Sequence, residues 1–350
     1  MLYDAMMSGL LSVYDYLSLH VLACLVPAFF IAGAVAVFVS KQSVIRYFSS
    51  KTKKIVSYGI ASVSGTVLAV CSCTILPLFA GIYKRGAGIG HATTFLYSGP
   101  AINILAIIYT ANILGFNLGA ARAILAVSMS ILIGLVMATL FKDYDIKNRT
   151  NVQFEMDDER NQPRWVLLLL FVFLVLILVI GTANLSLTAR VSIIALLILG
   201  VMFLLKYYFI GEEIRNWGYE TWDLTKKIFP ILIIGTFTVG VIAYYLPPET
   251  FRAFLGGNSL TSCFTASIIG ALLYMPTLLE VPIVSTTFGY SAGIIGSGPA
   301  LSLLLAGPAV SLPSMLVLHR IMGTKKTTAF IILVVSVSTL AGFAYGKVVG

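Results

Sequence analysis

Long apolar stretches dominate this chain, and short polar segments separate them. The apolar stretches fall near residues 17–40, 56–83, 87–114, 116–141, 165–183, 187–210, 228–246, 259–288, 291–320 and 327–349. Most reach the roughly 20 residues that a helix needs to cross about 30 Å of hydrocarbon. Because only helices and closed barrels satisfy their backbone in lipid, and no alternating strand pattern is present, we expect helices. The pattern predicts an all-α, polytopic membrane helix bundle, placed as a multi-pass protein in the cell (cytoplasmic) membrane.

The third and ninth stretches are interrupted in the middle, by Ser98-Gly99-Pro100 and by Ala306-Gly307-Pro308. Each is therefore either a crossing or a re-entrant hairpin, in which two half-helices enter and leave on the same side. If both re-enter, 17 of the 23 lysines and arginines share one side of the membrane. The positive-inside rule prefers that arrangement over an even division. It predicts about eight transmembrane helices plus two re-entrant half-helix hairpins, with both termini outside the cytoplasm.

The chain repeats itself weakly. A shift of 205 places Gly65 and Pro77 on Gly270 and Pro282, and a shift of 208 places the Gly-Pro-Ala at 99–101 on the one at 307–309. Under the re-entrant model the copies begin on opposite sides, which predicts an inverted internal repeat. We divide the chain into a first repeat (1–141), charged loops with a central transmembrane pair (142–227) and a second repeat (228–350).

In inverted-repeat transporters the substrate lies near the midplane, where broken helices meet, so the two breaks mark a candidate binding site. Gly99 tolerates unusual backbone conformations, Pro100 suits the first turn of a helix, and Ser98 would cap it. The freed N–H groups would attract an anion or an electron-rich oxygen. The alternative is a pair of proline kinks packed against neighbours. The substrate-binding residues predicted here are Ser98, Gly99, Pro100, Asn103, Gly307, Pro308 and Ser311.

Cys71-Ser72-Cys73-Thr74, followed by Pro77, is the sharpest local motif. On an intact helix the two thiols would point about 200° apart. Pro77 cannot donate to the carbonyl of Cys73, so we expect the helix to loosen and the thiols to converge. Two soft sulfurs suit a thiophilic species, and we predict Cys71 and Cys73 as its ligands, in the manner of a metal site. Thr74 and Pro77 are predicted to belong to the same substrate-binding site. The alternative is two small residues at a tight helix contact.

Pro276-Thr277-Leu278-Leu279-Glu280-Val281-Pro282 is the corresponding segment of the second copy. Glu280 is the only acid deep inside a predicted span, and an intramembrane carboxylate is costly enough to suggest function. Since burial favours its neutral form, Glu280 is a candidate proton-coupling residue, with Thr277 beside it in the binding site. The alternative is a structural carboxyl bonded to backbone that the prolines free.

Composition excludes several classes of protein. Hydrophobic residues make up 59% of the chain and charged residues 11%, so it is not an ordinary soluble domain. The net charge of +9 reflects basic loops, and we expect lipid and a small-molecule or ionic substrate as partners but no nucleic acid. The sequence is compatible with a homo-oligomer. No nucleotide-binding loop, catalytic triad or zinc spacing occurs, so we expect no cofactor and no enzyme.

Other polar and thiol residues receive ordinary interpretations. Lys84 and Arg85, placed on the outer side, are expected to be solvated boundary residues, and His91 to pack against a polar neighbour. Cys24 and Cys263 are expected to be small core residues.

At residues 71–103, and at 270–283 with 303–318, the chain resembles the ArsP/YraQ-type predicted permeases. The Cys-x-Cys-x3-Pro with its downstream Gly-Pro-Ala carries the likeness, although Thr74 stands where many relatives have Gly. ArsP members export trivalent organoarsenicals, so the resemblance implies that Cys71 and Cys73 meet arsenic.

Four functions follow from these patterns. The leading one is a secondary permease that exports a thiophilic solute such as a trivalent organoarsenical. The alternatives are a permease for a small inorganic anion such as a sulfur oxyanion, a membrane thiol oxidoreductase, and a channel-like component that needs a soluble partner.

Overall fold

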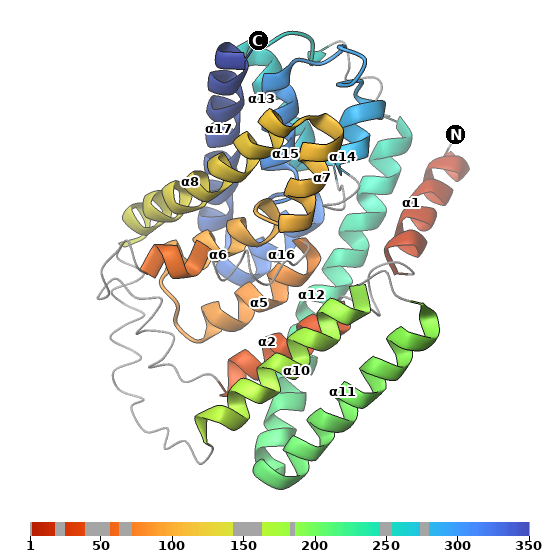
Figure 1. Ribbon diagram of the computed structural model, residues 1–350, viewed down its shortest axis with the longest axis vertical. Coiled ribbons are helices and arrows are strands. Elements are labelled where there is room, and N and C mark those ends of the chain that lie inside the picture. The colour runs from red at the N-terminus through yellow and green to blue at the C-terminus, as the bar shows by residue number, and fades with distance from the viewer. Residues whose placement is uncertain are drawn as a thin grey trace.

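Helices make up the regular structure of this protein, in a computed structural model that describes residues 2–17, 25–38, 57–62, 72–142, 163–182, 186–245, 254–273 and 280–349. The elements are α1 (Leu2–Tyr16), α2 (Val26–Phe38), α5 (Ser72–Lys84), α6 (Ile89–Ala101), α7 (Ile104–Leu114), α8 (Phe116–Leu140), α10 (Arg164–Thr182), α11 (Leu187–Tyr208), α12 (Gly211–Tyr245), α13 (Leu260–Leu272), α14 (Glu280–Pro282), the π-helical turn η3 (Ile283–Thr287), α15 (Ser297–Ala306), α16 (Leu312–Met322) and α17 (Thr324–Val349). These residues contain no strand, so the predicted all-α bundle is confirmed (Figure 1).

Several helices are long and apolar enough to cross a membrane. Within the described residues these are Phe116–Leu140, Thr188–Tyr208, Gly211–Ile242 and Thr324–Val349, with α6 and α7 together as a fifth if that bent pair is one span. Shorter apolar helices, α5 and α13 among them, fill the space between the long ones. This mixture of full-length and short apolar helices is typical of a polytopic membrane protein with broken or re-entrant segments.

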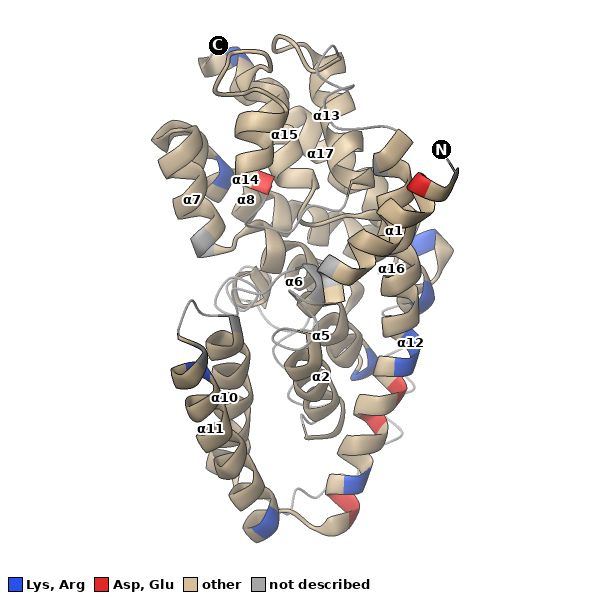
Figure 2. Cartoon of the chain, turned by 90° about the vertical axis from the view of Figure 1, so that its right-hand side faces the viewer, with Lys and Arg blue, Asp and Glu red and all other residues tan. Residues whose placement is uncertain are grey.

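The 35-residue helix α12 runs from one end of the molecule to the other. Near its start, Lys84 at the end of α5 lies 2.9 Å from both Glu220 and Asp223. Near its finish, Ser8 of α1 donates a hydrogen bond of 3.0 Å to the carbonyl of Gly240. We call the side marked by Lys84, Glu220 and Asp223 the charged end, and the side marked by Ser8 and Gly240 the opposite end. Figure 2 shows basic and acidic residues gathered along the first part of α12.

The pair α6 and α7 leads from the charged end to the opposite end. The start of α6 packs on the end of α8, where a Cβ atom on Gly90 would lie 2.5 Å from the carbonyl oxygen of Gly134. The end of α7 packs on the start of α8, where Arg122 donates to Thr110 at 2.9 Å. The two helices differ in direction by 46°, which bends the path without reversing it. The stretch 87–114 is thus a broken helix that runs through, and its prediction as a re-entrant hairpin is corrected.

The pair α15 and α16 packs along α17, as α6 and α7 pack along α8, but it runs in the direction opposite to that of α6 and α7. The hydroxyl of Ser302 in α15 donates to the carbonyl of Ser338 in α17, at 3.2 Å. Beyond α16, Lys326 reaches Tyr83 near the charged end, at 2.8 Å. The stretch 291–320 therefore runs from the opposite end to the charged end, and it too is a broken helix where we predicted a hairpin.

A reversal of direction occurs instead in the stretch 56–83. The helical residues 57–62 run parallel to α6, since the ring of Tyr58 stacks on His91 and the carbonyl of Ala61 accepts from Ser98. Helix α5 runs antiparallel to α6, because only a short turn connects them. The chain thus enters and leaves this region on the charged side. A 28-residue apolar stretch has the length of a crossing, so length alone could not distinguish the two.

The stretch 259–288 reverses in the second copy. Gly296, which precedes α15, donates its N–H to the carbonyl of Leu255, so α13 begins at the same end as α15. Helix α13 then runs inward until Gly270 packs against Gly307 in the break between α15 and α16. Residues 280–296 lead back to the opposite end. Among the described residues, the reversals of direction therefore occur in the stretches that carry Pro77 and Pro282, and not in the two stretches that were predicted to re-enter.

These directions place Lys84 and Arg85 at the charged end, together with Lys326. The prediction that they lie on the outer side was therefore wrong. It assumed that the stretch before them crosses the membrane, whereas that stretch returns. With these two residues added, the basic side of the chain becomes more basic, which makes the charge difference between the two sides larger.

The internal repeat is visible in matching contacts. Gly90 and Thr94 of α6 pack on Gly134 of α8, and the positions 208 residues later, Gly298, Ser302 and Gly342, make the same contacts between α15 and α17. In both crossings the backbones approach so closely that a Cβ atom would overlap the facing hydroxyl. Since α6 and α15 run in opposite directions, the repeat is inverted.

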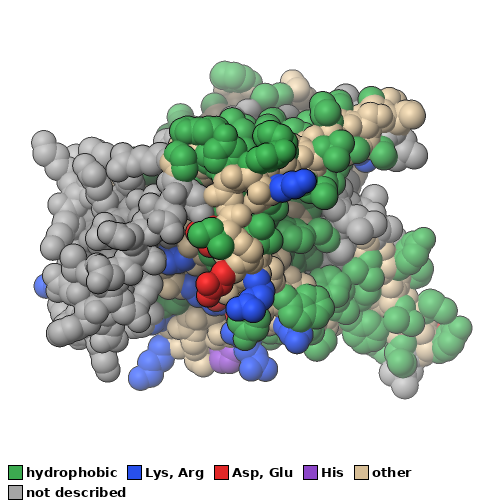
Figure 3. All heavy atoms as spheres, turned by 90° about the horizontal axis from the view of Figure 1, so that it is seen from below, with side chains coloured by type: hydrophobic (Ala, Val, Ile, Leu, Met, Phe, Trp, Pro, Cys, Tyr) green, Lys and Arg blue, Asp and Glu red, His purple; other side chains and the backbone are tan. Residues whose placement is uncertain are grey.

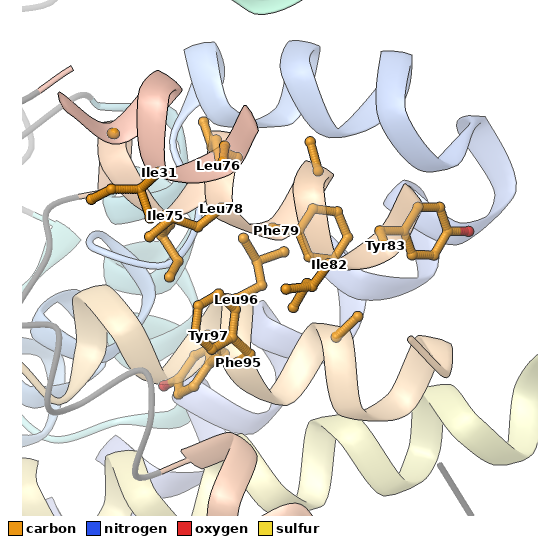
Figure 4. Close-up of a cluster of buried hydrophobic side chains, with 14 of the residues drawn as sticks. Ile31, Ile75, Leu76, Leu78, Phe79, Ile82, Tyr83, Phe95, Leu96 and Tyr97 are labelled. Atoms are coloured by element: carbon orange, nitrogen blue, oxygen red, sulfur yellow. The ribbon is translucent and has the colours of Figure 1, made fainter. Parts of the chain in front are cut away.

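A continuous apolar core fixes α5 in place. Phe79 and Ile82 of α5 face Leu96 of α6, Tyr83 lies at the far end of α5, and Ile31 of α2 covers the start of α5 (Figure 4). All of these side chains are buried. The core holds the half-helix that follows the Cys-x-Cys motif against both neighbours.

Candidate functional site

The two broken helices touch each other at their breaks. Helix α6 ends at Ala101 and α15 ends at Ala306. Near these ends, the hydroxyl of Tyr97 donates a hydrogen bond to the carbonyl oxygen of Leu305, at 3.2 Å, in a fully buried position. This contact brings the interrupted segments of both repeats together in the interior of the bundle, as the sequence predicted.

Each second half-helix starts at its break with a polar residue. The side-chain oxygen of Asn103 accepts a hydrogen bond from the N–H of Ala106 in the first turn of α7, at 3.4 Å. Ser311 precedes α16 and its hydroxyl pairs with that of Ser314, at 2.8 Å. Helices α7 and α16 lead away from the interior in opposite directions, so the positive ends of both face inward. Asn103 and Ser311, both predicted, therefore lie at helix N-termini.

The Gly-Pro motifs occupy different positions from those predicted. Gly99 and Pro100 lie in the last turn of α6, and Ser98 donates to the carbonyls of Phe95 and Ala61 instead of capping a helix. Gly307 and Pro308 lie in the turn that follows α15. The first break thus begins after its proline, because Pro100 is accommodated at the end of α6, whereas Pro308 lies within the second break. Pro313, in the first turn of α16, is the residue in the expected helix-starting position.

The second cysteine of the Cys-x-Cys motif lies at the beginning of α5. Thr74 is fully buried, and Pro77 lies inside the helix, which starts at Ser72. Cys71 and the side chain of Cys73 lie outside the described residues, so the convergence of the two thiols stays a prediction. The backbone of Cys73 is in the first turn of a half-helix that begins in the interior and ends at the charged end.

Glu280 opens α14 in the second hairpin and is fully buried, as predicted. Its carboxylate forms an ion pair with Arg122 of α8, which is also fully buried and donates to Thr110 of α7. Thr277 lies outside the described residues. Arg122 was not predicted as a site residue. The available signal was a lone arginine inside the 25-residue apolar helix Phe116–Leu140, since charges within a membrane segment pair with one another.

The ion pair does not satisfy all of its own polar atoms. Among the described residues, Nε of Arg122 and Oε2 of Glu280 have no hydrogen-bond partner although both atoms are buried. Oε2 faces the break between α15 and α16, 3.7 Å from the position of a Cβ atom on Gly307. The unpaired carboxylate oxygen is therefore directed at the interrupted backbone of the second repeat.

At the charged end, the first hairpin is joined to α12 by ion pairs. Lys84 bridges Glu220 and Asp223, and Asp223 also pairs with Lys227 one turn along α12, at 2.8 Å. Viewed from this end, basic and acidic side chains lie side by side on the surface (Figure 3). Such exposed pairs contribute little stability, about 1 kcal/mol or less. Their arrangement nevertheless ties the hairpin that carries the Cys-x-Cys motif to α12.

The remaining candidates have structural roles where they are described. His91 stacks on Tyr58 with ring centroids 4.3 Å apart, and Cys263 is a buried free thiol. Cys24 lies outside the described residues. In the described part of the chain, no three His, Cys, Asp or Glu side chains are grouped to hold a metal ion.

The inverted repeat, the broken helices and the buried polar groups where they meet define a multi-pass membrane transport protein. The chain belongs to the ArsP_1 family of predicted permeases, whose family model matches residues 6–347. It is 43% identical over 347 residues to the UPF0718 protein MJ0584 of Methanocaldococcus jannaschii, covering 96% of this chain and 94% of that one. It is 24% identical over 251 residues to the UPF0718 protein YraQ of Escherichia coli, covering 72% of this chain and 56% of the relative. No solved structure matches the chain.

Proposed function

We propose that this permease lies in the cell membrane and exports a thiophilic solute such as a trivalent organoarsenical, bound by Cys71 and Cys73. The main support is the position of the motif at the interior start of α5, beside the fully buried Thr74. The N-terminal end of a helix favours a thiolate, and thiolates are the form that binds soft elements. A solute bound there would lie between the hairpin and the broken helices.

Transport energy comes from an ion gradient in this proposal, because the sequence contains no nucleotide-binding loop. Glu280 would carry the coupling proton, since it is the buried acid at the second hairpin. A protonated and an ionised Glu280 would favour different pairings with Arg122, and hence different relative positions of the repeats.

Export from arsenic-sensitive cells tests the thiol proposal. Cells that express C71S/C73S should be as sensitive to a trivalent organoarsenical as cells without the protein, whereas the parent chain should protect them. The matched control is Cys263→Ser, which changes a buried thiol in α13 and should leave protection intact. Equal protection by C71S/C73S and the parent would refute the proposal.

A second candidate is a permease for a small inorganic anion such as a sulfur oxyanion. The inward-facing N-termini of α7 and α16, at which Asn103 and Ser311 lie, favour it because they concentrate partial positive charge. Uptake of labelled thiosulfate that survives thiol alkylation but is abolished by Asn103→Ala or Ser311→Ala would support this function over the first.

A further inference from the structure

The buried pair of Arg122 and Glu280 joins the two repeats. Arg122 belongs to α8 of the first repeat, and Glu280 belongs to the hairpin of the second. Both side chains are 0% exposed. Removing one partner of such a pair leaves a buried charge without compensation, which is strongly unfavourable. Any motion of the second hairpin relative to α8 must therefore supply Arg122 with another negative charge.

The two charges respond differently to protons. A carboxylate gains a proton and becomes neutral, whereas a guanidinium stays charged in proteins. Among the described residues around Glu280, Arg122 is the one charged side chain, while α7 contributes Thr110 and α15 presents Gly307. Protonation of Glu280 would consequently leave the positive charge of Arg122 in place and uncompensated.

The arrangement also contains unused binding capacity. Nε of Arg122 has no partner among the described residues, and neither has Oε2 of Glu280. A guanidinium binds a second oxygen atom through Nε when a planar or tetrahedral oxyanion replaces a single carboxylate contact. The hydroxyl of Thr110, already bound to Nη1 of Arg122, provides a further polar group at this place.

We propose that Arg122 is an anion-binding residue of the permease and that an oxyanion replaces Glu280 when Glu280 is protonated. One proton would then enter the site with each anion, so that neutralisation of Glu280 offsets one of the negative charges that the anion brings to Arg122. This inference rests on the proposed permease function and deepens its anion form, with Arg122 as the residue that recognises the anion.

The test is thermal unfolding of the purified full-length protein in detergent, with sodium thiosulfate compared with sodium gluconate at equal ionic strength. In Glu280→Gln, thiosulfate should raise the unfolding temperature equally at pH 6 and pH 8. In Arg122→Gln, lowering the pH from 8 to 6 should raise the unfolding temperature, because Glu280 has lost its positive partner, and thiosulfate should have no effect. The double variant E280Q/R122Q, which carries neither charge, should respond to neither. In the wild type, thiosulfate should bind more tightly at pH 6 than at pH 8, by up to about a hundredfold, because one proton is taken up with it.

Two results would overturn the proposal. One is a thiosulfate response of E280Q no larger than that of the double variant, and the other is wild-type binding that does not depend on pH. If E280Q is too unstable to purify in gluconate, the yield of folded protein purified in thiosulfate replaces the unfolding temperature as the readout. A higher yield in thiosulfate than in gluconate supports the proposal. Failure of the permease function is a separate result: wild-type proteoliposomes would show no flux of any solute while the binding pattern above persisted.

Discussion

Tyr97 and Leu305 occupy equivalent positions in the two repeats, 208 residues apart, and they touch each other: the hydroxyl of Tyr97 donates to the carbonyl of Leu305 at 3.2 Å. Equivalent positions of two copies can meet only where the axis that relates the copies passes between them. The pseudo-twofold axis of the protein therefore runs through this contact. Because the copies run in opposite directions, that axis lies in the membrane plane, which is the geometry of alternating-access transporters.

Replacement of Tyr97 by Phe should loosen this contact. The variant loses the hydrogen bond to Leu305 and a weaker one to the sulfur of Met129, while the ring still fills the core. Intramembrane hydrogen bonds contribute about 0.6 kcal/mol on average and up to about 1.7 kcal/mol. We expect a destabilisation in this range by thermal unfolding in detergent. Tyr109→Phe, on the exposed side of α7, is the control and should have no effect.

The two close helix crossings make a paired prediction. Alanine at Gly134 would place its Cβ against the hydroxyl of Thr94 and 2.6 Å from the carbonyl of Gly90, and alanine at Gly342 would meet Ser302 and lie 2.5 Å from the carbonyl of Gly298. Since backbone atoms cannot move aside, each substitution should cost about 1–3 kcal/mol of stability.

Unfolding temperatures of the detergent-solubilised variants check this. Gly218→Ala is the matched control, because it lies in α12 with nothing within 4 Å of the added Cβ atom. Alanine favours a helix over glycine by about 1 kcal/mol, so the control should be neutral or more stable. Similar losses for Gly134→Ala and Gly342→Ala would support the repeat, and a neutral result for either would contradict it.

The hydropathy pattern was sufficient for the class of fold but not for the path of the chain. Apolar stretches predicted the helices, the aligned Gly-Pro positions predicted the repeat, and the re-entrant model predicted that the repeat is inverted. The sequence could not predict which stretches reverse direction inside the bundle, because a 28-residue apolar stretch fits a crossing and a hairpin equally well. The direction of a helix depends on contacts such as those of Tyr58 with His91, which no local pattern contains.

At the site, the residue types were easier to predict than their partners. Glu280, Asn103 and Ser311 were identified because polar groups in apolar sequence need a reason to be there. Arg122 was missed as the partner of Glu280 because the two are 158 residues apart and belong to different repeats. The placement of Ser98 as a cap failed for a local reason, since α6 continues through Pro100 before it ends.

Asn258 should stabilise the opposite end of the second repeat. Its side-chain oxygen accepts from the N–H of Gly298 in the first turn of α15, at 2.9 Å, and its amide donates to the carbonyl of Gly346 in α17, at 3.1 Å. Asn258→Ala should cost about 1 kcal/mol or more, the magnitude of a lost helix cap. Asn258→Asp keeps the acceptor and loses the donor, so its unfolding temperature should fall between those of the alanine variant and the parent. Equal stability of all three would show that neither bond matters.

The side of the membrane on which Lys84 lies distinguishes a hairpin from a crossing in the first repeat. Lys84, Lys325 and Lys347 are all exposed, and each can be replaced singly by cysteine. Loss of the exposed ion pairs of Lys84 should cost less than about 1 kcal/mol, so K84C should fold. Because α5 returns to the charged end, a membrane-impermeant thiol reagent should label K84C and K325C from the cytoplasmic side and K347C from the other side. The unmodified chain gives the background from its own cysteines. Labelling of K84C from the same side as K347C would mean that residues 57–84 cross the membrane, and the inward-facing start of α5 would then have no basis.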